Sequence, residues 1–231
     1  MKRTLRMSGR MSAPISAPMR VIVAFLLLGS TVAWGQGAYK TEPVGPLNSS
    51  DVPKALEEKL QAQGTRLLSD KGAAVSEVWL VKSAAPGQSS AGSDAVYPTL
   101  SVGTLMGVLH FPAQGSDFRG QPIKPGYYTM RYGRMPQDGN HMGANPYPDF
   151  VALSPAAADT GIDKGLKFED LVKLSKQASG TGHPAVMSLV PVSQGASFPS
   201  VVQDEQGRWV LQTKLGDLPI ALVLVGQVSA S

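Results

Sequence analysis

The apolar segments of this chain are short, and glycine and proline separate them. The sequence has 25 glycines and 18 prolines among 231 residues, a content that interrupts helices and excludes a helical bundle. The most regular segment is Leu105–Phe111, in which two sets of apolar side chains alternate. A Pro-Gly pair then introduces a second alternating segment at residues 127–134. This period of two predicts strands that are covered on both faces.

Local residue patterns also predict further strands and two helices. Strands are expected at residues 66–69, 74–82, 150–153, 185–191, 200–203, 208–214 and 219–228. Helices are expected from about residue 50 to Gly64 and over residues 168–178, where Gly180 provides the stop. Because strands and helices do not alternate, the sequence predicts a mainly β fold. We expect an antiparallel β-sandwich, or a related closed sheet, of eight or nine short strands with two short peripheral helices.

The N-terminus has the order of residues found in a secretory signal peptide. Five basic residues and no acidic one occupy residues 1–20, an apolar segment of about 14 residues follows, and small residues precede Gln36. A membrane span needs about 20 apolar residues. We therefore predict a signal peptide at residues 1–35, an extended leader at 36–50 and a single domain at 51–231. The expected location is the periplasm or the extracellular space.

Removal of that peptide changes the charge. The whole chain has 21 basic and 17 acidic residues and a formal charge of +4, whereas residues 36–231 have 16 basic and 17 acidic residues and a charge of −1. Nucleic-acid binding depends on clustered lysine and arginine, and this remainder has no such cluster. We therefore expect no nucleic-acid partner and no stable membrane span after cleavage. The chain has no cysteine, which excludes disulfides, thiolate metal sites and cysteine nucleophiles.

Three motifs resemble those of a family of exported bacterial proteins of unknown function. They are RGQPIKPGYYT at residues 119–129, DGNHMG at 138–143 and SGTGHP at 179–184. The resemblance extends from about Ala55 to Val228. It implies an exported β protein, and it brings no assigned activity.

Two loops contain the residues best suited to chemistry. Residues 135–148 form a long loop, and loops of this length are often functional; the second loop is 180–184. If the two loops meet, they bring together six candidate ligand-binding residues: Arg131, Asp138, Asn140, His141, Asp149 and His183. His110 lies within an alternating strand, where we expect a half-buried histidine with a satisfied hydrogen bond.

The same loops leave a metal site open as an alternative. His141 and His183 with Asp138 and Met142 suit copper or zinc, because imidazole and carboxylate groups bind both ions and a thioether favours copper. No residue spacing matches a defined metal motif. Asp138-Gly139-Asn140 is also a turn signal in its own right.

Catalytic motifs are absent from the sequence. There is no Gly-x-Ser-x-Gly nucleophile motif, and the Gly-x-Gly at residues 180–182 follows a predicted helix where a phosphate loop would precede one. We therefore expect a binding protein rather than an enzyme, with a small molecule, a glycan or an envelope protein as its partner. A metal-binding protein or metal-dependent enzyme and a structural envelope component are the alternatives.

Overall fold

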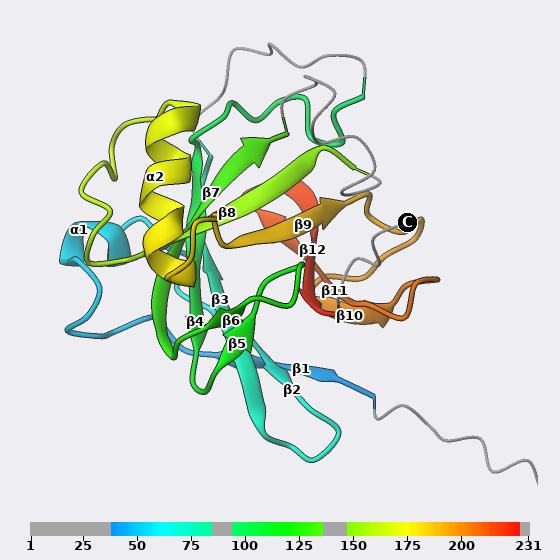
Figure 1. Ribbon diagram of the computed structural model, residues 1–231. Helices are drawn as coiled ribbons and strands as arrows, with labels where there is room; N and C mark the ends of the chain where they lie inside the picture. Colours follow the sequence, from blue (N-terminus) through cyan, green and yellow to red (C-terminus); the bar gives the residue numbers. More distant parts are fainter. Residues whose placement is uncertain (1–37, 85–93, 136–146, 227–231) are drawn as a thin grey trace, which may run out of the picture. The chain divides into compact units, whose positions relative to one another are not determined.

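Ten antiparallel strands form one curled sheet in the computed structural model, which describes residues 38–84, 94–135 and 147–226 (Figure 1). In spatial order these strands are β1 (Lys40–Val44), β2 (Gly64–Leu68), β3 (Ala74–Leu80), β4 (Leu105–Phe111), β7 (Gly126–Arg134), β8 (Asp149–Pro155), β9 (Val186–Val190), β12 (Leu218–Val225), β11 (Trp209–Leu215) and β10 (Ser200–Gln203). A separate two-stranded ribbon consists of β5 (Gly115–Ser116) and β6 (Pro122–Ile123). The mainly β prediction is confirmed.

The sheet curls far enough for its two edge strands, β1 and β10, to contact each other. Tyr39, just before β1, packs against Trp209 at the start of β11 with ring centroids 5.1 Å apart. One sheet therefore supplies both walls around the interior. Because alternate side chains of each strand point inward, the interior is filled with apolar residues such as Leu109, Met130 and Leu222.

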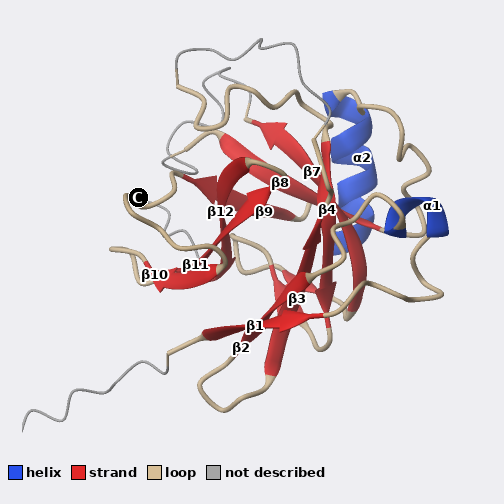
Figure 2. Cartoon of the chain, turned by 180° about the vertical axis from the view of Figure 1, so that it is seen from behind, coloured by secondary structure: helices blue, strands red, loops and turns tan. Residues whose placement is uncertain are grey.

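The outer face of the sheet is covered by two segments. The helix α1 (Lys54–Glu57) belongs to a segment that packs on the outer side of β3 and β4, where the indole of Trp79 donates a hydrogen bond to Gly45 O. The helix α2 (Phe168–Ser179) lies along the outer side of β7 and β8 (Figure 2). It ends at Gly180, whose left-handed conformation (φ 65°) confirms the predicted stop.

The helix α1 is shorter than predicted. Residues beyond Glu57 leave the helix because they pair with the end of β3: Leu60 forms a β-bridge with Val81, and the Gln61 amide donates to Leu80 O. Within the described residues, neither helix has the length and apolar content that crossing a bilayer requires.

The leader expected at residues 36–50 is corrected in part. Lys40–Val44 is extended, but it is strand β1 and pairs with β2 over five residue positions. Edge pairing satisfies the backbone groups that β2 would otherwise leave exposed. The domain therefore begins about ten residues earlier than the sequence predicts, with a first strand that the sequence pattern did not predict.

Candidate functional site

The interior of the curled sheet opens to solvent in a cleft of about 420 Å³ between its two ends, which we call the mouth. One wall comes from β1, β2 and β3, the other comes from β11, and residues 198–199 lie at the rim. The mouths of β-barrels are common ligand sites, and pockets for small molecules have volumes of about 300–1,000 Å³. The size and position of the mouth therefore suit a small ligand.

Strand alternation places polar side chains at the mouth. Thr65 of β2 pairs with Val78 of β3, and both line the cleft. Thr213 of β11 lies between the buried Leu211 and Leu215, on the same inward face. Thr65 and Thr213 are half-buried, because the interior is open to solvent at this end.

A carboxamide connects the two walls. Gln61 Nε2 donates to Val81 O at 3.2 Å and to Lys214 O at 3.0 Å, so this side chain joins the end of β3 to β11. The Lys214 ammonium lies over the ring of Phe198, 5.4 Å from its centroid. Within the described part of the chain, the residues that line the mouth include one lysine and no acidic residue or histidine, so their formal charge is positive.

Of the six predicted ligand-binding residues the structure describes three, Arg131, Asp149 and His183, and no hydrogen bond or ion pair joins any two of these three. Asp138, Asn140, His141 and Met142 fall outside the described residues. His183 is exposed in the turn after α2, where Ser179 Oγ donates to its carbonyl at 2.6 Å. The described residues contain no group of three or more potential metal ligands among histidine, aspartate and glutamate. The metal site stays a prediction.

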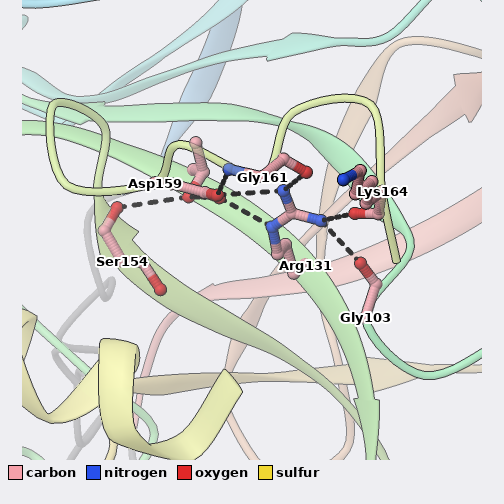
Figure 3. A network of polar contacts seen from close by, with 7 residues as sticks. Gly103, Arg131, Ser154, Asp159, Gly161 and Lys164 are labelled. Carbon is pink, nitrogen blue, oxygen red and sulfur yellow. Dashed lines mark hydrogen bonds and ion pairs between the residues drawn. The ribbon is translucent and has the colours of Figure 1, made fainter. Parts of the chain in front are cut away.

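Arg131 has no N–H donor left over for a ligand, because its side chain is completely buried and all five of its N–H donors have protein acceptors (Figure 3). Nε and Nη2 donate to the two carboxylate oxygens of Asp159 at 2.6 and 2.9 Å. The remaining donors bind the carbonyl oxygens of Gly103, Lys164 and Gly161. Arg131 therefore fastens the segment between β8 and α2 onto the sheet.

The pKa of Asp159 reflects this pairing. Burial is the largest influence and would raise the pKa, but the hydrogen bonds and charge of Arg131 and the hydroxyl of Thr129 outweigh it. The pKa of Asp159 is therefore below its ordinary value of 3.8. The ion pair is a structural element of the fold.

Asp149 is likewise buried, and both of its carboxylate oxygens accept hydrogen bonds from the protein itself. Its oxygens accept hydrogen bonds from the backbone amides of Val96 and Tyr97, both at 3.0 Å, and from the Tyr132 hydroxyl at 2.6 Å. Burial, followed by the hydrogen bond and charge of Asp149, raises the pKa of Tyr132. The carboxylate of Asp149 thus holds the segment that contains Tyr97, and a ligand contact at Asp149 stays a prediction.

Tyr97 in turn joins two strands of the sheet. Its hydroxyl donates to Val190 O of β9 at 2.6 Å and accepts from the Ala221 amide of β12 at 2.9 Å. Burial raises the pKa of Tyr97 to about 12. Apart from their hydrogen bonds to this hydroxyl, β9 and β12 pair at two residue positions. Tyr97 therefore reinforces the shortest strand pairing of the large sheet.

A polar row crosses five strands on the outer face, away from the mouth. Cross-strand pairing aligns Glu42, Arg66, Glu77, His110 and Tyr127. Arg66 bridges Glu42 at 2.8 Å and Glu77 at 2.6 Å, and Glu77 Oε2 lies 2.8 Å from His110 Nδ1. The His110 ring stacks on Tyr127 with centroids 4.1 Å apart. The prediction of a half-buried, satisfied His110 is confirmed.

Replacing Glu77 by glutamine is expected to lower the free energy of unfolding by about 1–3 kcal/mol at pH 7. This is the free energy that a hydrogen bond to a charged group usually contributes. Burial would raise the pKa of Glu77, but hydrogen bonds from His110 and Arg66 and the charge of Arg66 bring it below 4.5. A lowered carboxyl pKa stabilises the fold above the unfolded-state value, and this contribution is lost as pH falls through the folded value. Urea unfolding from pH 7 to pH 3 tests this. A difference between the two proteins that did not shrink with acid would contradict it.

No protein-family model, curated protein or solved structure matches the chain. The resemblance to exported bacterial proteins therefore stays a prediction that rests on the sequence motifs. The sequence patterns did not lead to the mouth, although the sequence contains one usable signal. Thr65 and Thr213 are polar residues at inward positions of strands whose other inward residues, Leu67, Leu211 and Leu215, are apolar, and such positions indicate that the interior opens to solvent there.

Proposed function

We propose that this protein is exported and binds a small organic molecule at the mouth without transforming it. The observation that carries the proposal is a cleft of about 420 Å³ with an apolar floor and several polar groups at its edge. Ligand sites have this composition: apolar walls supply binding energy, and a few polar groups fix orientation.

The composition of the mouth favours binding over catalysis. The described residues that line it include no histidine, aspartate, glutamate, serine, tyrosine or cysteine. General acid–base catalysis needs a group that exchanges a proton near neutral pH, and covalent catalysis needs a nucleophile beside a base. The lysine and threonines of the mouth have no carboxylate or imidazole beside them in the cleft to act as that base.

Export is proposed from the N-terminal sequence. The basic segment, the short apolar segment and the small residues before Gln36 support cleavage there. The mass of the exported protein should correspond to a chain that begins at Gln36, within a few residues. Recovery of the full-length chain from the cytoplasm alone would contradict export.

Binding at the mouth is tested by a fragment screen on ¹⁵N-labelled protein with a library of small acids, amides and monosaccharides. We expect the hits to shift the backbone amides of Thr65, Leu80 and Thr213, which belong to both walls. A Thr213→Trp variant, whose indole fills the cleft, is expected to weaken these hits at least tenfold. A second blocking variant, Thr65→Tyr, approaches the cleft from the other wall.

Gln206→Trp provides the matched control, because it places the same indole at the exposed tip of the β10–β11 hairpin. This variant should bind as the unmodified protein does. Blocking variants must first show the dispersed amide spectrum of a folded chain. A screen with no hit at the mouth, or hits that survive both blocking variants, would overturn the proposed site.

A further inference from the structure

We infer that the ligand of the mouth is a small organic carboxylate, whose charged end is held by Lys214 and whose apolar part lies on the floor of the cleft. This inference rests on the proposed function and adds the chemical class of the ligand. It follows from the charge at the rim, the geometry of Lys214 and the aromatic content of the cleft.

The charge at the mouth is positive and comes from a single lysine. Lys214 is the only charged residue that lines the cleft, and within the described residues it makes no ion pair. Three other described lysines have acceptors nearby: Lys54 pairs with Glu57, Lys59 pairs with Asp163, and Lys82 donates to Glu58 O. An unpaired ammonium beside a cleft attracts anions and disfavours cations.

The position of the ammonium is defined by an aromatic ring. Lys214 Nζ lies 5.4 Å from the centroid of Phe198, within the range of a cation–π contact. Phe198 also lines the cleft, so this contact keeps the long lysine side chain at the rim. An ammonium that is already held near the ligand loses less side-chain freedom on binding than a fully mobile one.

The same ring argues against a glycan. Sugars bind proteins through the flat faces of aromatic residues, and among the described residues Phe198 is the only aromatic one that lines the mouth. One face of that ring is already covered by Lys214. The cleft therefore offers a glycan a single ring with one face occupied, whereas it offers a carboxylate an unpaired cation.

The rest of the cleft suits the remainder of such a ligand. Val78 and Leu80 form an apolar floor that can bury a hydrocarbon chain or ring. The hydroxyl groups of Thr65 and Thr213 have no hydrogen bond to the described residues in the structure, and they face the cleft from opposite walls. They are available as donors to polar groups on the part of the ligand that lies within the cleft.

Matched pairs of probes test the inference. Cyclohexanecarboxylate, benzoate and hexanoate are each titrated against their neutral carboxamides, with amide shifts at the mouth as the readout. We expect the carboxylates to bind about fivefold more tightly than the amides, the size expected of one ion pair at a partly exposed site. Lys214→Met should remove this preference and Lys214→Arg should retain it. Lys71→Met, at the exposed tip of the β2–β3 hairpin, should leave it unchanged.

The outcomes separate the inference from the proposed function. Equal binding of acids and amides at the mouth, or tighter binding of cellobiose than of any acid, would overturn the carboxylate while keeping the mouth as the binding site. A preference for acids that persists in Lys214→Met would overturn the role of Lys214. If neither acids, amides nor cellobiose shift the mouth amides, the inference and the proposed site both fail.

Discussion

Replacing Arg131 by methionine is expected to lower the free energy of unfolding by about 3–5 kcal/mol, the usual loss when one partner of a buried ion pair is removed. The change leaves the carboxylate of Asp159 buried with the Thr129 hydroxyl and the Gly161 amide as its remaining donors. It also removes the donor to the carbonyl oxygens of Gly103 and Lys164. Urea unfolding followed by circular dichroism measures the effect.

Two further variants make this prediction specific. Adding Asp159→Leu to Arg131→Met should recover part of the loss, because the double variant no longer buries an unpaired charge. Recovery stays incomplete, since the backbone carbonyls remain without donors. Arg119→Met, which removes an exposed arginine that lies over the ring of Phe118, should cost less than about 1 kcal/mol. A loss below that value in Arg131→Met would contradict the structural role of the ion pair.

Replacing Asp149 by asparagine is expected to lower the free energy of unfolding by about 2–4 kcal/mol. Both carboxylate oxygens accept hydrogen bonds, and hydrogen bonds to charged groups contribute about 1.5–3 kcal/mol. An asparagine directs an NH₂ group toward at least one of these donors, so two donors then face each other in the interior.

Hydrogen exchange locates the effect of this substitution. Asp149 holds the segment of Tyr97, and the Tyr97 hydroxyl accepts the Ala221 amide. We therefore expect faster exchange at Ala221 in Asp149→Asn. Tyr97→Phe should accelerate the same amide with a smaller loss of about 1–3 kcal/mol. Asp217→Asn, at an exposed turn, should change neither quantity. Unchanged exchange at Ala221 would show that Asp149 does not position Tyr97.

The strands were predictable from local patterns because the sheet is covered on both faces. The segment Leu105–Phe111 is strand β4 with the same bounds, and its alternating apolar sets face the interior on one side and the α1 segment on the other. The end of α2 was predictable for a similar reason, since Gly180 adopts a conformation that other residues disfavour. Such features depend on a few neighbouring residues.

The roles of Arg131 and Asp149 were not predictable from the same patterns. A charged residue in a strand beside a long loop is expected to face a ligand, unless another segment folds over it. Asp159 and the carbonyls that follow it cover Arg131, and they lie about 30 residues further along the chain. That pairing is tertiary information, and no local periodicity contains it.

The mouth was also not predictable from local patterns, because its walls are far apart in the sequence. Its two walls meet through residues such as Gln61 and Lys214, which are 153 positions apart in the sequence. Only the order of all ten strands in the sheet determines that they face each other. A sequence pattern can mark Thr65 as an inward polar residue, but it cannot identify the strand on the opposite wall.

Closure of the sheet also sets the order in which the mouth is completed. A chain that is made or translocated from its N-terminus presents β1, β2 and β3 long before residues 198–214 emerge. Until then the first wall has no opposite wall, and the apolar floor of Val78 and Leu80 is open to solvent. Contacts between such distant segments close a large loop, which makes them slow to form. The mouth is therefore completed late, and the binding site that we propose there forms only when nearly the whole chain is in place.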